Sequence, residues 1–311
     1  MRLLRGLLAA ALLAAAGGAA AQQDPVGQSA LKRGLSAYQN GQQEAAIPAL
    51  TEVAATGDAS TRFLAEFYLA RAYAEGAGAV ANHTKAYVLY RKIADENVEV
   101  PERSQRAAYV AKALIALAGY VRSGLEEIDL PANPRSAARY LEHAATYFGD
   151  KDAQYELART YLGAGGWSGG EISIGLHYLS VLTQAGHSGA QATLADLFWR
   201  GRHVKKDEAR ALALAGIAMA NASEPERKWI EASYAGILCA TPAPARAAAG
   251  GLADRWRKML AAPATEPPGA PAGDLLPDRP CPNSEAVAAA PPPRAEAIRS
   301  AVMLDTTASK K

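Results

Sequence analysis

The residues between Ala190 and Ala220 follow a pattern of apolar and polar positions that predicts two packed helices. Small and apolar residues recur at helical spacing on one face of the first helix: Ala190, Leu194, Ala195 and Phe198. Gly201 then ends this helix, and Asp207 is placed to cap the next one. The second helix has an apolar face of its own: Ala211, Leu214, Ala215 and Ala218. The stretch therefore predicts an antiparallel helix hairpin whose alanines let the two backbones approach closely.

The same pattern occurs three more times earlier in the chain. The anchor positions of the four hairpins are Tyr73, Val121, Tyr161 and Phe198, which lie 48, 40 and 37 residues apart. Repeats of about this length are typical of helical solenoids, because a single hairpin cannot bury its apolar face and must stack on a neighbour. The sequence therefore predicts an all-α, right-handed solenoid of antiparallel helix hairpins over residues 59–222.

Both ends of this array are expected to differ from its middle. Residues 22–58 predict a shorter capping hairpin, with Pro48 inside its second helix. Residues 223–260 lose the period and predict two helices that close the other end. Residues 261–311 hold ten of the chain's 18 prolines and predict a disordered tail, because they bury too little apolar area to offset the entropy of ordering.

Two connections inside the array are longer than the others. Asn97–Arg106 is polar, contains Pro101 and explains the long first spacing as an insertion between two hairpins. The second long connection starts at Leu125 and closes with Asn133-Pro134, a good N-cap followed by proline at the first helical position. We expect contacts with partners at the exposed ends of the hairpins, namely residues 120–133, Trp167 and residues 199–203.

The first 21 residues predict a secretory signal peptide. Arg2 and Arg5 precede an apolar run over residues 6–16, and small residues up to Ala21 provide a cleavage site. The apolar run is shorter than the roughly 20 residues that a membrane span needs. We therefore expect cleavage near Ala21, no membrane insertion after cleavage, and a periplasmic protein.

Charge and cysteine content narrow the classes of function. The net charge is +2, with acidic and basic residues interspersed, so no basic stripe favours nucleic-acid binding. Cys239 and Cys281 are the two cysteines, which is too few for a disulfide framework or a zinc cluster. A single bridge between them and two isolated thiols both remain open.

The sequence offers little catalytic chemistry. The segment 166–170 reads Gly-Trp-Ser-Gly-Gly, which matches the G-x-S-x-G pattern of hydrolases, but that mechanism needs a strand before the serine. This segment joins two predicted helices, where glycines serve as a turn. No histidine pair has the spacing of a metal site, and no phosphate-binding loop is present. We expect neither catalytic residues, metal nor cofactor.

Several residues are candidates for protein binding or pH sensing. Aromatic, arginine and histidine residues near the predicted turns resemble interface anchors, with core packing as the alternative: Tyr120, Trp167, Trp199, Arg200, Arg202 and His203. Trp167 and Trp199 lie nearest the turns and are expected to be exposed. His143 and His177 lie on second helices of hairpins, where each either senses pH at a packed interface or simply packs there.

The repeats resemble a known class. Leu194-Ala195, Phe198, Gly201, Val204 and Asp207 fit the pattern of Sel1-like repeats, relatives of the tetratricopeptide class. Three stretches give a narrower resemblance to the ExoR family of alphaproteobacterial exopolysaccharide regulators: residues 90–97, 144–150 and 152–155. The chain departs from that family in its glycine-rich loop, residues 163–170, and in its proline-rich tail.

The resemblance implies a regulatory protein without catalytic residues. Members of the ExoR family are periplasmic proteins that hold a membrane sensor histidine kinase inactive, and their proteolysis releases the kinase. The expected partner is therefore the periplasmic sensor domain of such a kinase. A general periplasmic scaffold for envelope or cell-wall assembly is the alternative.

Overall fold

Residues 25–76, 81–163 and 165–260 are described by a computed structural model. The predicted signal peptide, the predicted tail from Ala261 and the predicted partner thiol Cys281 lie outside these residues. Within the described residues the chain forms α-helices, one short 3₁₀ turn and no β-strand beyond an isolated bridge between Leu125 and Leu130. The prediction of an all-α protein is confirmed.

The helices follow one another at short intervals along the whole described chain. Their bounds are α1 Pro25–Gln39, α2 Gln43–Thr56, α3 Ala59–Glu75, α4 His83–Glu96, α5 Ala107–Ser123, α6 Pro134–Thr146, α7 Lys151–Leu162, α8 Gly169–Gln184, α9 Ser188–Arg200, α10 Glu208–Asn221, α11 Glu224–Ala240 and α12 Ala243–Leu260. The 3₁₀ turn is η2, Glu126–Ile128.

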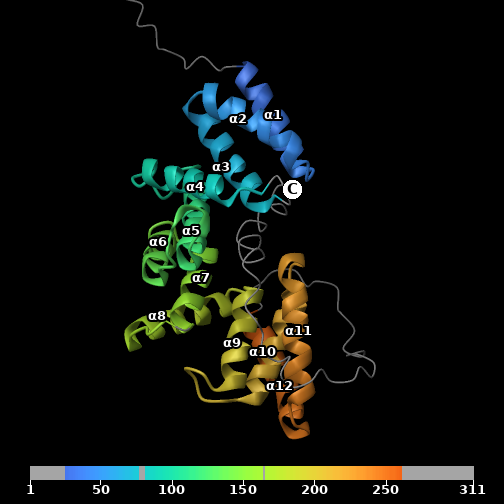
Figure 1. The fold of residues 1–311 in the computed structure, drawn as a ribbon. Helices are drawn as coiled ribbons and strands as arrows, with labels where there is room; N and C mark the ends of the chain where they lie inside the picture. The colour runs from blue at the N-terminus through green and yellow to red at the C-terminus, as the bar shows by residue number, and fades with distance from the viewer. Residues whose placement is uncertain (1–24, 77–80, 164, 261–311) are drawn as a thin grey trace, which may run out of the picture.

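Each helix except α12 packs mainly against its neighbours in the sequence, which builds an elongated array (Figure 1). The hairpins α3–α4, α5–α6, α7–α8 and α9–α10 are the four repeats found in the sequence, and α1–α2 packs on α3 as the predicted cap. At the other end α12 packs on α10 and α11 packs on both α9 and α10. The predicted solenoid of helix hairpins is therefore confirmed.

Local signals in the sequence set the helix ends. Gly201 adopts the left-handed conformation, with φ of +66°, which glycine reaches without steric cost. The Asp207 carboxylate accepts a 2.9 Å hydrogen bond from the Arg210 amide and so caps α10. In the same way, Asn133 caps α6 by accepting a 2.9 Å hydrogen bond from the Ser136 amide. These caps satisfy amides that otherwise have no partner in the first helical turn.

The core consists largely of alanine, leucine and tyrosine side chains shared between neighbouring hairpins. One detail differs from the predicted apolar face of α9. Leu197 is completely buried, whereas Leu194 is only partly buried. The reason is that α9 packs on α8, α10 and α11, so more than one of its faces is covered. A single stripe therefore underestimates the buried surface of a helix inside the array.

Candidate protein-binding surfaces

The G-x-S-x-G segment is a helix cap. The Ser168 hydroxyl accepts a 3.3 Å hydrogen bond from the Glu171 amide, and the Glu171 carboxylate accepts a 2.6 Å bond from the Ser168 amide. This reciprocal pair is a capping box at the start of α8. The serine follows a turn between two helices instead of a strand, so the arrangement lacks the geometry of a hydrolase nucleophile.

Trp167, next to that cap, folds back onto the array. Its ring lies edge-on to Tyr161 at 5.0 Å, and the Arg135 guanidinium lies 5.1 Å from its centre. Arg135 also donates a 3.2 Å hydrogen bond to the Gly166 carbonyl. The indole is therefore half-buried and fixed between α6 and α7, and it is less exposed than the sequence predicted.

The prediction that Tyr120 belongs to an exposed binding surface is wrong. Its side chain is only 3% exposed, because α5 is enclosed between α4 and α6. The hydroxyl lies 3.0 Å from His83 Nδ1, and the ring lies edge-on to Tyr87. Burial raises the pKa of Tyr120 well above its ordinary value, so the hydroxyl stays protonated. Tyr120 is thus a core residue that joins α4 to α5.

The turn between α9 and α10 exposes three of the residues predicted to bind a partner: Arg200, Arg202 and His203. Arg200 pairs with Asp196 at 2.7 Å, while Arg202 and His203 lie on the surface. Trp199 is half-buried beneath Lys206, whose ammonium group is 5.4 Å from the ring centre, so it is less exposed than the sequence predicted. This basic turn therefore presents Arg202 and His203 at the surface, beside a half-buried tryptophan.

The α9–α10 turn also touches the preceding repeat. His203 Nε2 lies 3.2 Å from the carbonyl of Leu162, the last residue of α7. The loop that holds Trp167 begins directly after this residue. The structure thus brings two of the predicted groups, the Trp167 loop and the basic turn, to the same side of neighbouring hairpins.

The two candidate pH sensors differ in their surroundings. The His143 ring stacks on Tyr147 at 5.1 Å with an angle of 9° and meets Phe148 edge-on. Its Nε2 atom is shielded from solvent and has no hydrogen-bond partner among the described residues. His177 is exposed on α8, so the expectation that it faces a neighbouring repeat is wrong. A role of either histidine in pH sensing stays a prediction.

A partly buried ion triad connects α5 to α7. The Glu156 carboxylate lies 3.1 Å from Arg122 on α5 and 2.8 Å from Arg159 on its own helix. Burial works to raise the pKa of Glu156, but the Arg159 and Arg122 guanidinium groups outweigh burial and lower it. Glu156 is therefore ionised over the whole neutral range, and its charge is matched from two sides.

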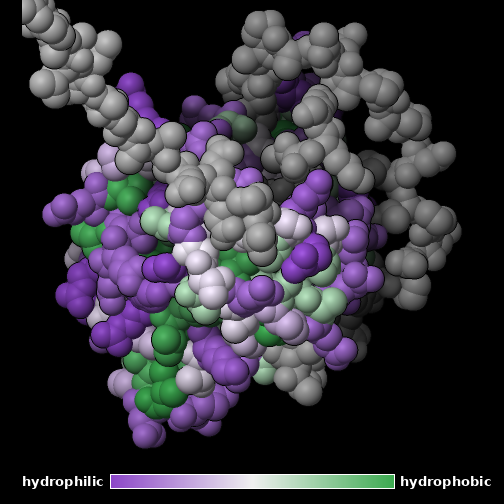
Figure 2. All heavy atoms as spheres, turned by 90° about the horizontal axis from the view of Figure 1, so that it is seen from above, coloured by the Kyte–Doolittle hydropathy of each residue, from purple (hydrophilic) through white to green (hydrophobic). Residues whose placement is uncertain are grey.

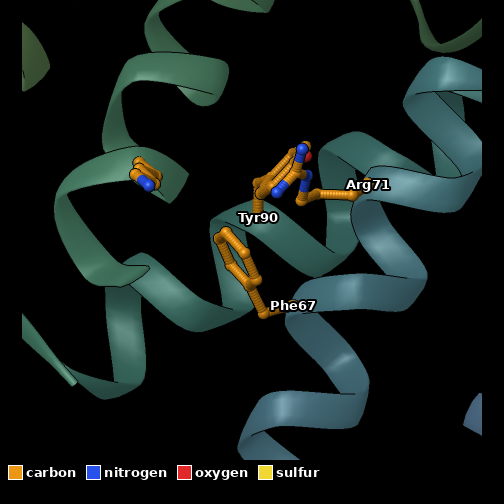
Figure 3. A pocket seen from close by; sticks show the side chains of 4 residues that line it. Phe67, Arg71 and Tyr90 are labelled. Carbon is orange, nitrogen blue, oxygen red and sulfur yellow. The ribbon is translucent and has the colours of Figure 1, made fainter. Parts of the chain in front are cut away.

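The gap shown in Figure 3 lies between α3, α4 and α5 and is lined by Phe67, Arg71, Tyr90 and Lys112. Its empty space is about 170 Å³, including the part open to solvent. None of this space has room for a water-sized molecule, whereas small-molecule sites usually measure about 300–1,000 Å³. Arg71 is held beside the gap by Glu75 at 3.1 Å. We assign this gap to imperfect packing between two hairpins, because it is too small for a typical ligand.

Two further properties of the described residues limit the chemistry. No group of three or more histidine, cysteine, aspartate or glutamate side chains in this part of the chain is arranged to hold a metal ion. Over the same residues, none of the helices combines the length and the apolar character that crossing a membrane requires. Cys239 lies near the end of α11, and its predicted bridge to Cys281 stays a prediction.

One exposed apolar surface was missed by the sequence patterns. Val98 is 57% exposed and Tyr147 is 39% exposed. The Tyr147 hydroxyl donates a 3.3 Å hydrogen bond to the Val100 carbonyl, which brings the insertion after α4 against the end of α6. We call the four residues Val98, Val100, Tyr147 and Phe148 the insertion surface. The valines in an otherwise polar insertion were the available signal, but their neighbour Tyr147 is distant in sequence.

The exposed apolar residues are few and scattered. Figure 2 shows apolar side chains in separate green patches among polar ones on the face seen from above. The other large apolar residues with high exposure among the described residues are Val88, Ile128, Ile174 and Val181. The described residues therefore define a helical-repeat protein, built as a stack of helix hairpins.

Comparison with known proteins identifies the family. The chain is 31% identical over 203 residues to the exopolysaccharide production negative regulator of Rhizobium meliloti (strain 1021), covering 65% of this chain and 71% of the relative. It is 30% identical over 202 residues to the protein of the same name from Rhizobium leguminosarum bv. viciae, with coverage of 65% and 71%. The chain belongs to this family of exopolysaccharide production negative regulators, the ExoR family.

Two other comparisons complete these findings. No family model matches the chain. The structure is similar to a crystal structure of a Sel1 repeat protein from Oxalobacter formigenes, with a TM-score of 0.49 and 18% sequence identity. That similarity covers 75% of this chain and 86% of the other.

Proposed function

We propose that the protein is a negative regulator of exopolysaccharide production that binds the periplasmic sensor domain of a membrane histidine kinase and lowers its output. The observation that carries the proposal is the similarity to two proteins named as negative regulators of exopolysaccharide production, each over 71% of its length. The kinase and the periplasm come from the resemblance to the ExoR family and from the predicted signal peptide.

The architecture suits regulation by binding. Stacked hairpins form an extended surface on which several turns lie side by side, and such surfaces recognise proteins more readily than small molecules. The basic turn with Arg202 and the insertion surface are both accessible on this array. Regulation then proceeds through occupancy of the partner and requires no chemical step by this chain.

Inhibition has a thermodynamic condition. A bound regulator lowers the activity of a kinase only when it binds the inactive conformation of the sensor domain more tightly than the active one. A shift of the population from 99% active to 99% inactive needs a difference of about 5.5 kcal/mol between the two affinities. Several contacts along an extended surface can supply such a difference, whereas a single exposed ion pair contributes about 0–1 kcal/mol.

The proposal is tested by deleting the gene and measuring kinase-dependent transcription together with exopolysaccharide yield. We expect both to rise, and both to return to normal when the full chain is supplied again. In parallel, cross-linking in intact cells should join the chain to the sensor domain of one histidine kinase. Unchanged transcription, together with no kinase sensor domain among the cross-linked proteins, would reject inhibition and leave the scaffold alternative.

A further inference from the structure

We propose that the insertion surface is the contact for the sensor domain, and that the matching region of that domain presents an apolar side chain flanked by lysine or arginine. This inference rests on the proposed function and adds the place of contact and the chemistry of the partner. It starts from two exposed apolar side chains, Val98 and Tyr147, which the structure places at one end of neighbouring hairpins.

The insertion is held in one conformation before any partner arrives. Buried Asn97 donates a 2.8 Å hydrogen bond to the Ile93 carbonyl and fixes the start of the loop. At its other end, Arg106 donates a 3.0 Å bond to the Ala59 carbonyl and lies over the Phe63 ring at 5.0 Å. Because the loop is already ordered, binding does not pay the full entropy of ordering it.

The aromatic side of the surface is rigid as well. The Tyr147 ring is stacked on His143 and lies edge-on to Phe148 at 4.9 Å. A tyrosine fixed in this way offers a large contact area with little loss of side-chain freedom, which is typical of interface anchors. Single exposed apolar residues need no explanation, but here the exposed Tyr147 is hydrogen-bonded to the segment that carries the exposed Val98.

The charges around the insertion indicate the sign of the partner. Asp95 pairs with Arg91, and Glu102 pairs with Arg103. Glu99, directly beside Val98, is exposed and has no ion-pair partner among the described residues. A basic group on the partner would face this free carboxylate at the edge of the apolar contact, where charges mainly steer association.

The outer face of α8 is the competing surface. Ile174 and Val181 are exposed there at a spacing of two helical turns. They lie on a regular helix, and the one carboxylate of α8, Glu171, is paired with Arg135. This face therefore gives no information about the chemistry of an occupant, and it serves as a control.

The test measures binding of the full chain to the purified sensor domain recovered by the cross-linking described above. We expect Val98→Glu and Tyr147→Glu to weaken binding at least about tenfold, as loss of central interface residues does. Val88→Glu is the matched control, because Val88 is 55% exposed on α4 but lies outside the insertion. Ile174→Glu controls for the face of α8. Both controls should bind like the wild type.

A charge reversal tests the proposed basic partner separately. Glu99→Lys should weaken binding by about three- to tenfold and reduce its dependence on salt concentration, because it places two basic groups opposite each other. The thermal unfolding midpoint of each variant shows that it is folded. If Tyr147→Glu lowers that midpoint, the proposal is judged by the binding of Val98→Glu and Glu99→Lys alone.

The outcomes separate the two proposals. If no sensor domain binds the wild type, the proposed function fails and this inference fails with it. If the wild type binds and the insertion variants bind equally well, the function stands and the insertion surface is rejected. Equal weakening by Val88→Glu or Ile174→Glu would also reject it, because the effect would not be local.

Discussion

Two connections in the array differ in how their geometry is fixed. One is the turn between α9 and α10, and the other is the insertion between α4 and α5. In the turn, Gly201 and Asp207 determine where one helix ends and the next begins. In the insertion, Arg106 stands at the start of α5 without a side-chain cap and reaches back to Ala59. Local sequence therefore sets the geometry of the regular turn, whereas the insertion combines local hydrogen bonds, such as that from Asn97 to Ile93, with distant contacts, such as that from Arg106 to Ala59.

The largest expected effect tests the regular side of this comparison. Leu197→Ala removes a completely buried side chain just before the turn and should lower the free energy of unfolding by about 2–5 kcal/mol. Leu157→Ala, in the preceding repeat, should cost a similar amount because Leu157 is equally enclosed. Urea unfolding followed by circular dichroism measures both. A loss below about 1 kcal/mol would mean that the core relaxes around the cavity.

The second prediction concerns a non-local contact inside the array. Glu156→Gln should cost about 1.5–3 kcal/mol at neutral pH, because it removes the charge that Arg122 and Arg159 share. The lowered pKa of Glu156 means that the folded state favours the ionised carboxylate more than the unfolded state does. This stabilisation is complete above the ordinary pKa of 4.5 and is lost as the pH falls through the lower, folded-state value.

The pH dependence provides the control for that variant. The difference in free energy of unfolding between the wild type and Glu156→Gln should be constant above about pH 5 and shrink below pH 4. Unfolding curves at several pH values measure this difference directly. A difference that persists unchanged in acid would show that the amide disturbs packing instead of removing a charge.

The sequence predicts the features that local contacts set, and it misses those that depend on contacts between distant residues. The period of the apolar residues predicted the solenoid, and glycine and capping residues predicted helix ends such as the start of α6 after Asn133. Tyr120 was misplaced because a position near the end of a helix was taken as exposed, while the neighbouring helices cover it. The surface at Val98 was missed because Tyr147, which completes it, follows 49 residues later in the sequence.

The third prediction measures the strength of a local signal. Asp207→Ala removes the cap of α10 and should cost about 1 kcal/mol, within the range of 0.5–2 kcal/mol for such caps. Asp207→Asn keeps an acceptor for the Arg210 amide and should recover most of this loss. Equal destabilisation by both variants would mean that the charge of Asp207, which pairs with Arg210 at 3.2 Å, matters more than the cap.

The smallest expected effect on stability tests the insertion itself. Val98→Ser replaces an exposed apolar side chain that contributes little to the fold, so the free energy of unfolding should change by less than about 0.5 kcal/mol. Arg106→Ala is the contrasting variant, because it removes the contacts to Ala59 and Phe63 that hold the loop. Hydrogen exchange of amides 97–106 should speed up in Arg106→Ala and stay unchanged in Val98→Ser. If Val98→Ser also loosened the loop, the valine would be part of the packing of the insertion, and its exposure would no longer mark a surface kept for a partner.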